Sequence, residues 1–310
     1  MPDLLLGVIG LGTRWERFRT ATSNVSGVAI TALHDPVSQR ARNHALQLDC
    51  AAVEGFHALL RRPDVQAVLI LGRTWYGPLP LVAACRNRVP VLLTEPPTVA
   101  DVTREPVRMA VETCSQSVFV EFFYRRCPAT RQLRRLIDGE LGSVREIVVN
   151  LAPLVAAEED NVCGHTNATA WIHAIDWCNL VVGESPEKIE VEAAPDQPPS
   201  ATILSYTGGA IATIYRKHLI VPTAESPSQR SAAAKVACTH GTAYLFSPSK
   251  LVVFRDTEPR PIDSPPEGCP EVETIEAFKA AIRGGETELT PAATLLELLD
   301  RLRTIHGRWE

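Results

Sequence analysis

An apolar run followed at once by a glycine-rich turn opens this chain and constrains its fold more than any other feature. The run covers Leu4–Ile9, the turn is Gly10-Leu11-Gly12, and a helix-compatible segment follows over residues 14–23. Further runs that are apolar on both faces alternate with segments of helical periodicity as far as Val91–Leu93. Buried strands separated by helices indicate a parallel sheet with helices on each side. The sequence therefore predicts an α/β domain at its start.

The glycine turn has the spacing of a loop that binds the pyrophosphate of a dinucleotide. Gly10 permits the tight turn, and Gly12 lets the backbone N–H groups around Thr13 approach the phosphates at a helix N-terminus. Asp35 ends the second predicted strand, where a carboxylate can accept a hydrogen bond from a ribose 2′-hydroxyl. We predict that Gly10, Gly12, Thr13 and Asp35 bind NAD. NADP remains possible, although Asp35 would repel its 2′-phosphate.

The third glycine of the usual motif is replaced by Trp15. That glycine allows close packing of the helix on the strand. The tryptophan must therefore either push the helix outward or direct its side chain away from the loop. The alternative to a working site is a sheet of this type that no longer binds a nucleotide.

The pattern changes after Val118-Phe119-Val120, and we place the domain boundary there, with domains over residues 1–121 and 122–310. Short alternating runs dominate the second part, and Thr207-Gly208-Gly209 between two of them is typical of a hairpin turn. Two amphipathic helices close the chain. The predicted fold class is α/β, a Rossmann dinucleotide-binding domain followed by an α+β domain with a largely antiparallel, open-faced sheet.

Composition excludes several classes of function. The formal net charge is −5, and no run of Lys or Arg suggests nucleic-acid binding. Arg14, Arg17 and Arg19 are interpreted as a solvated helix face. No apolar run is long enough to span a bilayer and no signal peptide is recognisable, so we predict a cytoplasmic protein. The eight cysteines are scattered without a Cys-x-x-Cys pair, so we predict no metal site.

Several short motifs follow one another along the chain: the glycine turn, His34-Asp35-Pro36, Val65–Ile70, Glu95-Pro96-Pro97, Tyr124–Pro128, Leu136–Val144 and His173-Ala174-Ile175-Asp176. In this order they resemble the Gfo/Idh/MocA family of oxidoreductases, and the resemblance covers nearly the whole chain. It implies a Rossmann domain that binds NAD(P) and a second domain that carries the substrate side. It also implies pairing of open sheets, so we expect a homo-oligomer, either a dimer or a tetramer.

The resemblance further implies which residues transfer a proton to or from the substrate, and this chain differs from the family pattern at two of those positions. In such enzymes the lysine of a Glu-Lys-Pro motif contacts the nicotinamide and the substrate oxygen. An aspartate four residues before a histidine completes the site. This chain keeps Glu95 and His173 but has Pro96 for the lysine and Thr169 for the aspartate. Proline has no donor, and threonine does not act as a base near neutral pH.

The remaining candidates come from the matched positions. His173 and Tyr124 are the predicted acid–base residues, because an imidazole changes charge near neutral pH and a phenol can donate a proton. The alternative for both is plain core packing. The other candidates are the cofactor contacts Gly72, Glu95 and Arg125 and the substrate contacts Trp75, Tyr76, Thr169 and Trp171.

Two functions remain open at this point. The first is an NAD(P)-dependent oxidoreductase that transfers hydride to or from a small carbonyl, alcohol or imine. An imine would lessen the need for a lysine, because its nitrogen can arrive protonated. The second is a non-catalytic ligand-binding or regulatory homologue that kept the fold and lost the proton donor.

Overall fold

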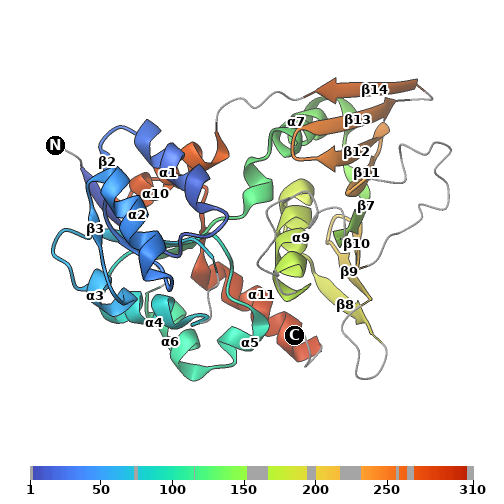
Figure 1. Cartoon of the computed structure of the whole chain (residues 1–310). Helices are drawn as coiled ribbons and strands as arrows, with labels where there is room; N and C mark the ends of the chain where they lie inside the picture. The colour runs from blue at the N-terminus through green and yellow to red at the C-terminus, as the bar shows by residue number, and fades with distance from the viewer. Residues whose placement is uncertain are drawn as a thin grey trace. The chain divides into compact units, whose positions relative to one another are not determined.

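The computed structural model describes residues 3–72, 76–114, 116–151, 167–193, 200–216, 232–255, 258–263 and 269–305. The chain forms two compact units (Figure 1). Unit 1 comprises Met1–Phe122 and Gly268–Asp300, and unit 2 comprises Phe123–Glu267 and Arg301–Glu310. Among the described residues, no helix combines the length and the apolar character that crossing a membrane requires.

Unit 1 contains a sheet of seven strands in the order β15-β6-β5-β4-β1-β2-β3. All neighbouring strands are parallel except β15, which pairs antiparallel with β6. The central strands are buried on both faces, as a parallel sheet covered by helices requires. The strands are β1 Leu4–Ile9, β2 Val28–His34, β3 Ala51–Ala52, β4 Ala67–Ile70, β5 Val91–Leu93, β6 Val118–Val120 and β15 Thr290–Pro291.

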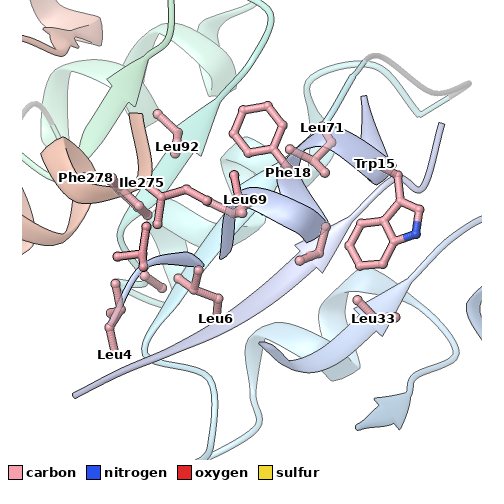
Figure 2. Packing of buried hydrophobic residues seen from close by; sticks show 14 of the residues in the cluster. Leu4, Leu6, Trp15, Phe18, Leu33, Leu69, Leu71, Leu92, Ile275 and Phe278 are labelled. Atoms are coloured by element: carbon pink, nitrogen blue, oxygen red, sulfur yellow. The ribbon is translucent and has the colours of Figure 1, made fainter. Parts of the chain in front are cut away.

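Helices alternate with most of the strands of unit 1 along the chain. The last helix, α11, is divided between the two units after Asp300. Leucines of β1, β4 and β5 form the core on one face of the sheet, together with Phe18 of α1 and with Ile275 and Phe278 of α10 (Figure 2). The helices are α1 Trp15–Asn24, α2 Ser38–Leu48, α3 Phe56–Leu60, α4 Leu79–Arg86, α5 Val99–Val102, α6 Glu105–Thr113, α10 Pro270–Ile282 and α11 Ala292–Ile305.

The division of the chain differs from the predicted domains at the C-terminal end. The sequence placed all of residues 122–310 in the second domain, whereas Gly268–Asp300 joins unit 1. The physical reason is burial and strand pairing. Ile275 and Phe278 are buried in the core of the first sheet. Thr290 and Pro291 pair with Val120 and Phe119 of β6.

Unit 2 contains a sheet of eight strands in the order β14-β13-β12-β11-β7-β10-β9-β8. Only the β7–β10 pair is parallel, so the predicted, largely antiparallel sheet is confirmed. Gly209, with a φ of 82°, closes the predicted hairpin turn between β9 and β10. The strands are β7 Val144–Asn150, β8 Lys188–Glu192, β9 Ala201–Ser205, β10 Ile211–Tyr215, β11 Ala234–Cys238, β12 Gly241–Ser247, β13 Lys250–Arg255 and β14 Glu258–Asp263.

Two helices pack on this second sheet, α9 Asn167–Val182 on β7 and β10, and α7 Pro128–Leu136 on β12 and β13. The short segments η1 Phe123–Arg126 and η2 Ile137–Leu141 flank α7. The two helices are joined by a hydrogen bond of 3.0 Å from the Trp177 indole N–H to the Thr130 hydroxyl. Because α9 packs on the sheet and is bonded to α7, the orientation of this helix, which carries predicted site residues, is fixed within unit 2.

Candidate functional site

The glycine turn after β1 is shaped for a ligand. Gly10 has a φ of 87°, and its N–H donates to the carbonyl of His34 at 2.9 Å. The N–H groups of Gly12 and Thr13 have no acceptor within the described part of the chain, and they precede the first turn of α1. A Cβ at Gly12 would meet no atom within 4 Å. Exposed amides at a helix N-terminus fit the pyrophosphate of a dinucleotide.

Trp15, which replaces the third glycine, does not fill this turn. Its side chain is buried in the core of unit 1, which also contains Leu33 (Figure 2). The indole meets the imidazole of His44 on α2 edge-on, with ring centroids 5.3 Å apart. Of the two possibilities that the sequence left open, the structure shows the second, in which the side chain is directed away from the loop.

Asp35 ties the glycine turn to the next element of the fold. Its carboxylate is 3% exposed and accepts hydrogen bonds from the N–H groups of Leu11 at 2.7 Å and Val37 at 2.8 Å. Nη1 of Arg40 lies 3.4 Å from both carboxylate oxygens, and the Arg40 side chain is 46% exposed. The predicted contact of Asp35 with a ribose stays a prediction. The structure shows that the Asp35 carboxylate stabilises the glycine turn through its hydrogen bond from Leu11, and that the guanidinium of Arg40 lies beside this carboxylate.

A mostly apolar recess lies where β4 and β5 end. Its polar members are the carboxylates of Glu95 and Asp101, and a Cβ at Gly72 would come within 3.6 Å of Oε1 of Glu95. None of the described lining residues is a lysine, arginine or histidine. The lining residues are Ile70, Gly72, Gly77, Pro78, Leu81, Leu93, Glu95, Pro96, Pro97 and Asp101.

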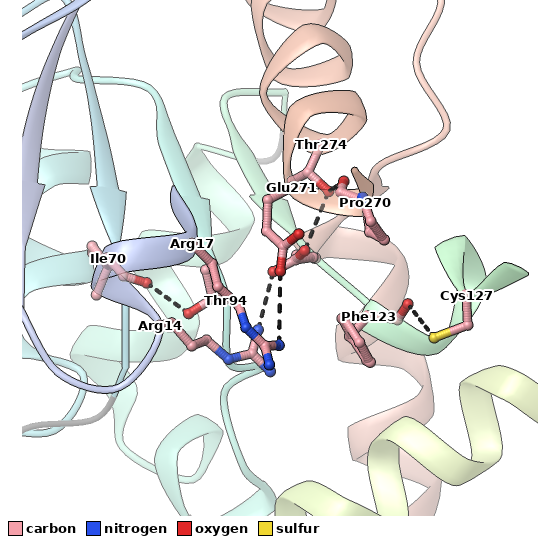
Figure 3. Close-up of polar contacts among 10 residues, drawn as sticks. Arg14, Arg17, Ile70, Thr94, Phe123, Cys127, Pro270, Glu271 and Thr274 are labelled. Carbon is pink, nitrogen blue, oxygen red and sulfur yellow. Dashed lines mark hydrogen bonds and ion pairs between the residues drawn. The ribbon is translucent and has the colours of Figure 1, made fainter. Parts of the chain in front are cut away.

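Backbone anchoring fixes the two sides of this recess. The hydroxyl of Thr94 donates to the carbonyl of Ile70 at 3.3 Å, which joins the ends of the two strands (Figure 3). Thr98 and Asp101 cap the start of α5 reciprocally, each side chain bonding to the other's backbone N–H. The recess is therefore built on rigid elements, and Pro96 contributes no proton donor to it.

Sequence reasoning missed a buried ion pair beside the glycine turn. The carboxylate of Glu121, which follows β6, is 1% exposed and accepts from Nη1 of Arg14 at 3.1 Å and from the Thr274 hydroxyl at 3.2 Å. Arg17 lies 3.9 Å from Glu271 of α10 (Figure 3). The interpretation as a solvated face holds for Arg17, which is exposed, and for Arg19, which is partly exposed, but not for Arg14. No local motif could show a pair whose members lie so far apart in the sequence.

In unit 2, the predicted acid–base residues lie together. His173 on α9 and Tyr124 on η1 are both buried, and their rings meet edge-on with centroids 6.2 Å apart and planes inclined by 82°. Thr169 lies one helical turn before His173 and is buried, as is Trp171. The structure therefore brings the predicted acid–base pair and Thr169 into one cluster on α9 and η1.

Arg125 and Asp176 form a bidentate ion pair in the same unit. Nε of Arg125 donates to Oδ2 of Asp176 at 2.7 Å, and Nη2 donates to Oδ1 at 2.5 Å. Burial raises the pKa of Asp176, and the two hydrogen bonds from Arg125 oppose that rise. The pair fastens η1 to α9 and so holds Tyr124 beside His173. The cofactor contact predicted for Arg125 stays a prediction.

Two predicted substrate residues, Trp75 and Tyr76, precede α4 in the sequence. Trp75 lies outside the described residues. Tyr76 is buried, stacks on His34 with ring centroids 6.1 Å apart, and meets Phe56 edge-on at 5.2 Å. Within the described ranges, no group of three or more His, Cys, Asp or Glu side chains is arranged to hold a metal ion.

The architecture is similar to that of several solved oxidoreductases. A 3-ketoreductase from Actinomadura kijaniata in complex with NADP and TDP-benzene has a TM-score of 0.72 at 18% identity, over 98% of each chain. An oxidoreductase from Agrobacterium radiobacter in complex with NAD+, L-tartaric acid and magnesium has a TM-score of 0.71 at 16% identity, over 99% of this chain and 97% of that one. At these identities the likeness shows the fold.

Sequence comparison shows a likeness over the first part of the chain. The inositol 2-dehydrogenase 2 of Mycolicibacterium vanbaalenii is 29% identical over 146 residues, which are 46% of this chain and 43% of that protein. Residues 4–122 match the model of an oxidoreductase family with an NAD-binding Rossmann fold, GFO_IDH_MocA. The predicted fold class is confirmed. The match over residues 4–122 agrees with the predicted resemblance to the Gfo/Idh/MocA oxidoreductases and with the predicted nicotinamide cofactor, and it covers the first part of the chain only.

Proposed function

We propose that the protein is an NAD(P)-dependent oxidoreductase that moves hydride to or from a carbon atom of a small carbonyl, alcohol or imine. The observation that carries this proposal is the glycine turn, which is held in shape by Asp35 and presents the N–H groups of Gly12 and Thr13 at an open helix N-terminus. NAD(P) supplies or accepts the hydride when it is bound. The match of residues 4–122 to an oxidoreductase family with an NAD-binding Rossmann fold supports the same proposal.

The chain's own residues would hold the dinucleotide and place its ends. The amides of Gly12 and Thr13 would bind the pyrophosphate, and the positive end of the α1 dipole would favour its charge. We assign Asp35 to the ribose side, where it orders the loop through Leu11. Gly72 and Glu95, which line the recess at the ends of β4 and β5, would take the nicotinamide side.

His173 is the proposed acid–base residue. Its imidazole can take up or release a proton at Nδ1 or Nε2 near neutral pH, which neither Pro96 nor Thr169 can do. Tyr124 contacts the ring edge-on and would orient it. A buried imidazole that is oriented by fixed neighbours can exchange a proton without prior rearrangement. An imine that arrives protonated would need less from this group than a carbonyl compound, whose oxygen must receive a proton as the hydride is transferred.

A matched pair of glycine variants tests the dinucleotide site. Gly12 and Gly139 both leave open space where a Cβ would be, and neither has a positive φ, so alanine is tolerated by the fold at both positions. Gly12→Ala should weaken NAD(H) binding at least tenfold, because the methyl group enters the space that the phosphates need. Gly139→Ala should leave the affinity unchanged. Tryptophan fluorescence titration gives both values, and equal affinities in the two variants would refute the assignment.

Replacement of the lysine by Pro96 favours a second candidate, a regulatory or ligand-binding homologue without turnover. The two functions differ in one measurement, the consumption of bound NADH in the presence of a panel of small carbonyl compounds and imines. For the enzyme we expect turnover that falls at least tenfold in His173→Gln, while the dissociation constant of NADH is unchanged. Tight NADH binding without turnover of any compound would favour the second candidate.

A further inference from the structure

Two cysteine side chains lie together in a groove of unit 1 that the proposed reaction does not use. Cys85 is in the last turn of α4, and Cys114 is the residue at which α6 ends. Both line a groove between these helices, together with Met109 and Arg86. Cys85 is buried and Cys114 is half-buried, so one sulfur is more accessible from the groove than the other.

The thiol of Cys114 lies against the backbone of Cys85. It donates to the carbonyl oxygen of Cys85, with Sγ 3.6 Å from that oxygen. Burial and the neighbouring Cys114 raise the pKa of the Cys85 thiol, so its proton is held more firmly than that of an ordinary thiol. Cys127 and Cys269 also make hydrogen bonds, but their partners are Phe123 and Glu271 and not another cysteine.

We infer that Cys85 and Cys114 form a reversible dithiol site, which low-molecular-weight disulfides such as oxidised glutathione convert to an intramolecular disulfide. The site is independent of the proposed function and lies on helices rather than in the glycine turn. Because Sγ of Cys114 already lies 3.6 Å from the Cys85 carbonyl oxygen and both residues line one groove, rotation of the side chains can bring the two sulfur atoms to bonding distance. The position of Cys114 at a helix end allows such a rotation more readily than a position inside a helix.

The reaction divides into two exchanges. The thiolate of Cys114, the more accessible sulfur, attacks one sulfur of oxidised glutathione and expels a glutathione thiolate, which leaves a mixed disulfide. Cys85 then loses its proton to solvent, and its sulfur attacks the Cys114 sulfur and expels the second glutathione thiolate. The protein loses two hydrogen atoms, and oxidised glutathione gains them as two thiols. An excess of reduced glutathione reverses both steps.

Peptide mapping of the full-length protein tests the site. The native protein is incubated with oxidised glutathione, quenched in acid, unfolded, alkylated and digested with trypsin. We expect peptide 74–86, which contains Cys85, to appear linked to peptide 109–125, which contains Cys114. The linked species should be lighter than the sum of the two peptides by the mass of two hydrogen atoms, and dithiothreitol should remove it.

Serine variants provide the controls. Cys50→Ser alters a half-buried cysteine elsewhere in unit 1 and should leave the linked peptide pair unchanged. Cys85→Ser should stop the reaction at glutathione on Cys114. The proposal is overturned if the wild type ends at that same mixed disulfide, if both cysteines are recovered alkylated, or if another pair of cysteines is linked instead.

Discussion

At the scale of single residues, we expect Asp35 and Arg40 to decide which nicotinamide cofactor is preferred. The buried carboxylate of Asp35 should favour NAD(H), because it would repel a 2′-phosphate, and the half-exposed guanidinium of Arg40 beside it should oppose that effect. Arg40→Ala should therefore weaken NADP(H) binding by about 0.5–1 kcal/mol, or roughly two- to fivefold, and leave NAD(H) binding nearly unchanged.

Fluorescence titration of both cofactors measures this difference, and Arg42→Ala is the matched control. Arg42 lies on the same helix and is similarly exposed, but it pairs with Glu54 instead of Asp35. An equal loss of NADP(H) affinity in both variants would mean that the effect comes from the net charge of the protein and not from the position of Arg40 beside Asp35. A gain in NADP(H) affinity in Arg40→Ala would contradict the assignment.

The lysine position gives a second prediction at this scale. Pro96→Lys alone should not create or raise turnover, because the aspartate position still holds Thr169 and the recess contains the carboxylate of Glu95. That carboxylate would favour the charged ammonium and hold back its proton. Assays of NADH consumption test this, with NADH affinity as the check on folding. A robust gain of turnover in the single variant would contradict it.

The sequence could place these residues but not their contacts. The spacing from Gly12 to the end of β2 predicts the position of Asp35. Its hydrogen bonds to Leu11 and Val37 depend on the path of the loop, which a single sequence does not determine. The pair of Arg14 and Glu121 joins residues that are 107 positions apart, and no local pattern contains that information.

At the scale of elements, α10 shows what periodicity can and cannot predict. The apolar stripe through Ile275 and Phe278 predicts a helix with one buried face, and this is what the structure contains. The stripe does not indicate which of the two sheets covers the helix. The sequence therefore placed α10 in the second domain, whereas the structure has it in unit 1. Burial against the first sheet places α10 in unit 1.

The packing of α10 can be measured. Phe278 is 0% exposed and meets Phe119 of β6 edge-on at 6.0 Å. Phe278→Ala should lower the free energy of unfolding of unit 1 by about 3–5 kcal/mol, because it removes an aromatic ring from a closed core. Denaturant unfolding checks this. Leu46→Ala on α2, where the side chain is 83% exposed, is the control and should change it by less than about 0.5 kcal/mol. A comparable loss in both variants would contradict the packing.

At the scale of the whole molecule, two units with separate sheets and cores should respond separately to the cofactor. A ligand that binds only the folded form stabilises the structure that holds it, by about 2.7 kcal/mol at 100 times its dissociation constant. The proposed NAD(P) site is built from β1, α1 and the ends of β4 and β5, all in unit 1. The stabilisation should therefore appear in unit 1.

Hydrogen exchange measured by mass spectrometry separates the two units along the chain. With NADH at that concentration, the slowest amides of β1 and β4 should exchange about 100-fold more slowly, since they open only when the whole unit unfolds. The slowest amides of β7 and β10, the parallel pair in the second sheet, should be almost unaffected. In Gly12→Ala, with an affinity at least tenfold lower, the protection in unit 1 should fall to about tenfold or less. Equal protection of both sheets would mean that the units unfold together, and protection confined to the second sheet would contradict the proposed cofactor site.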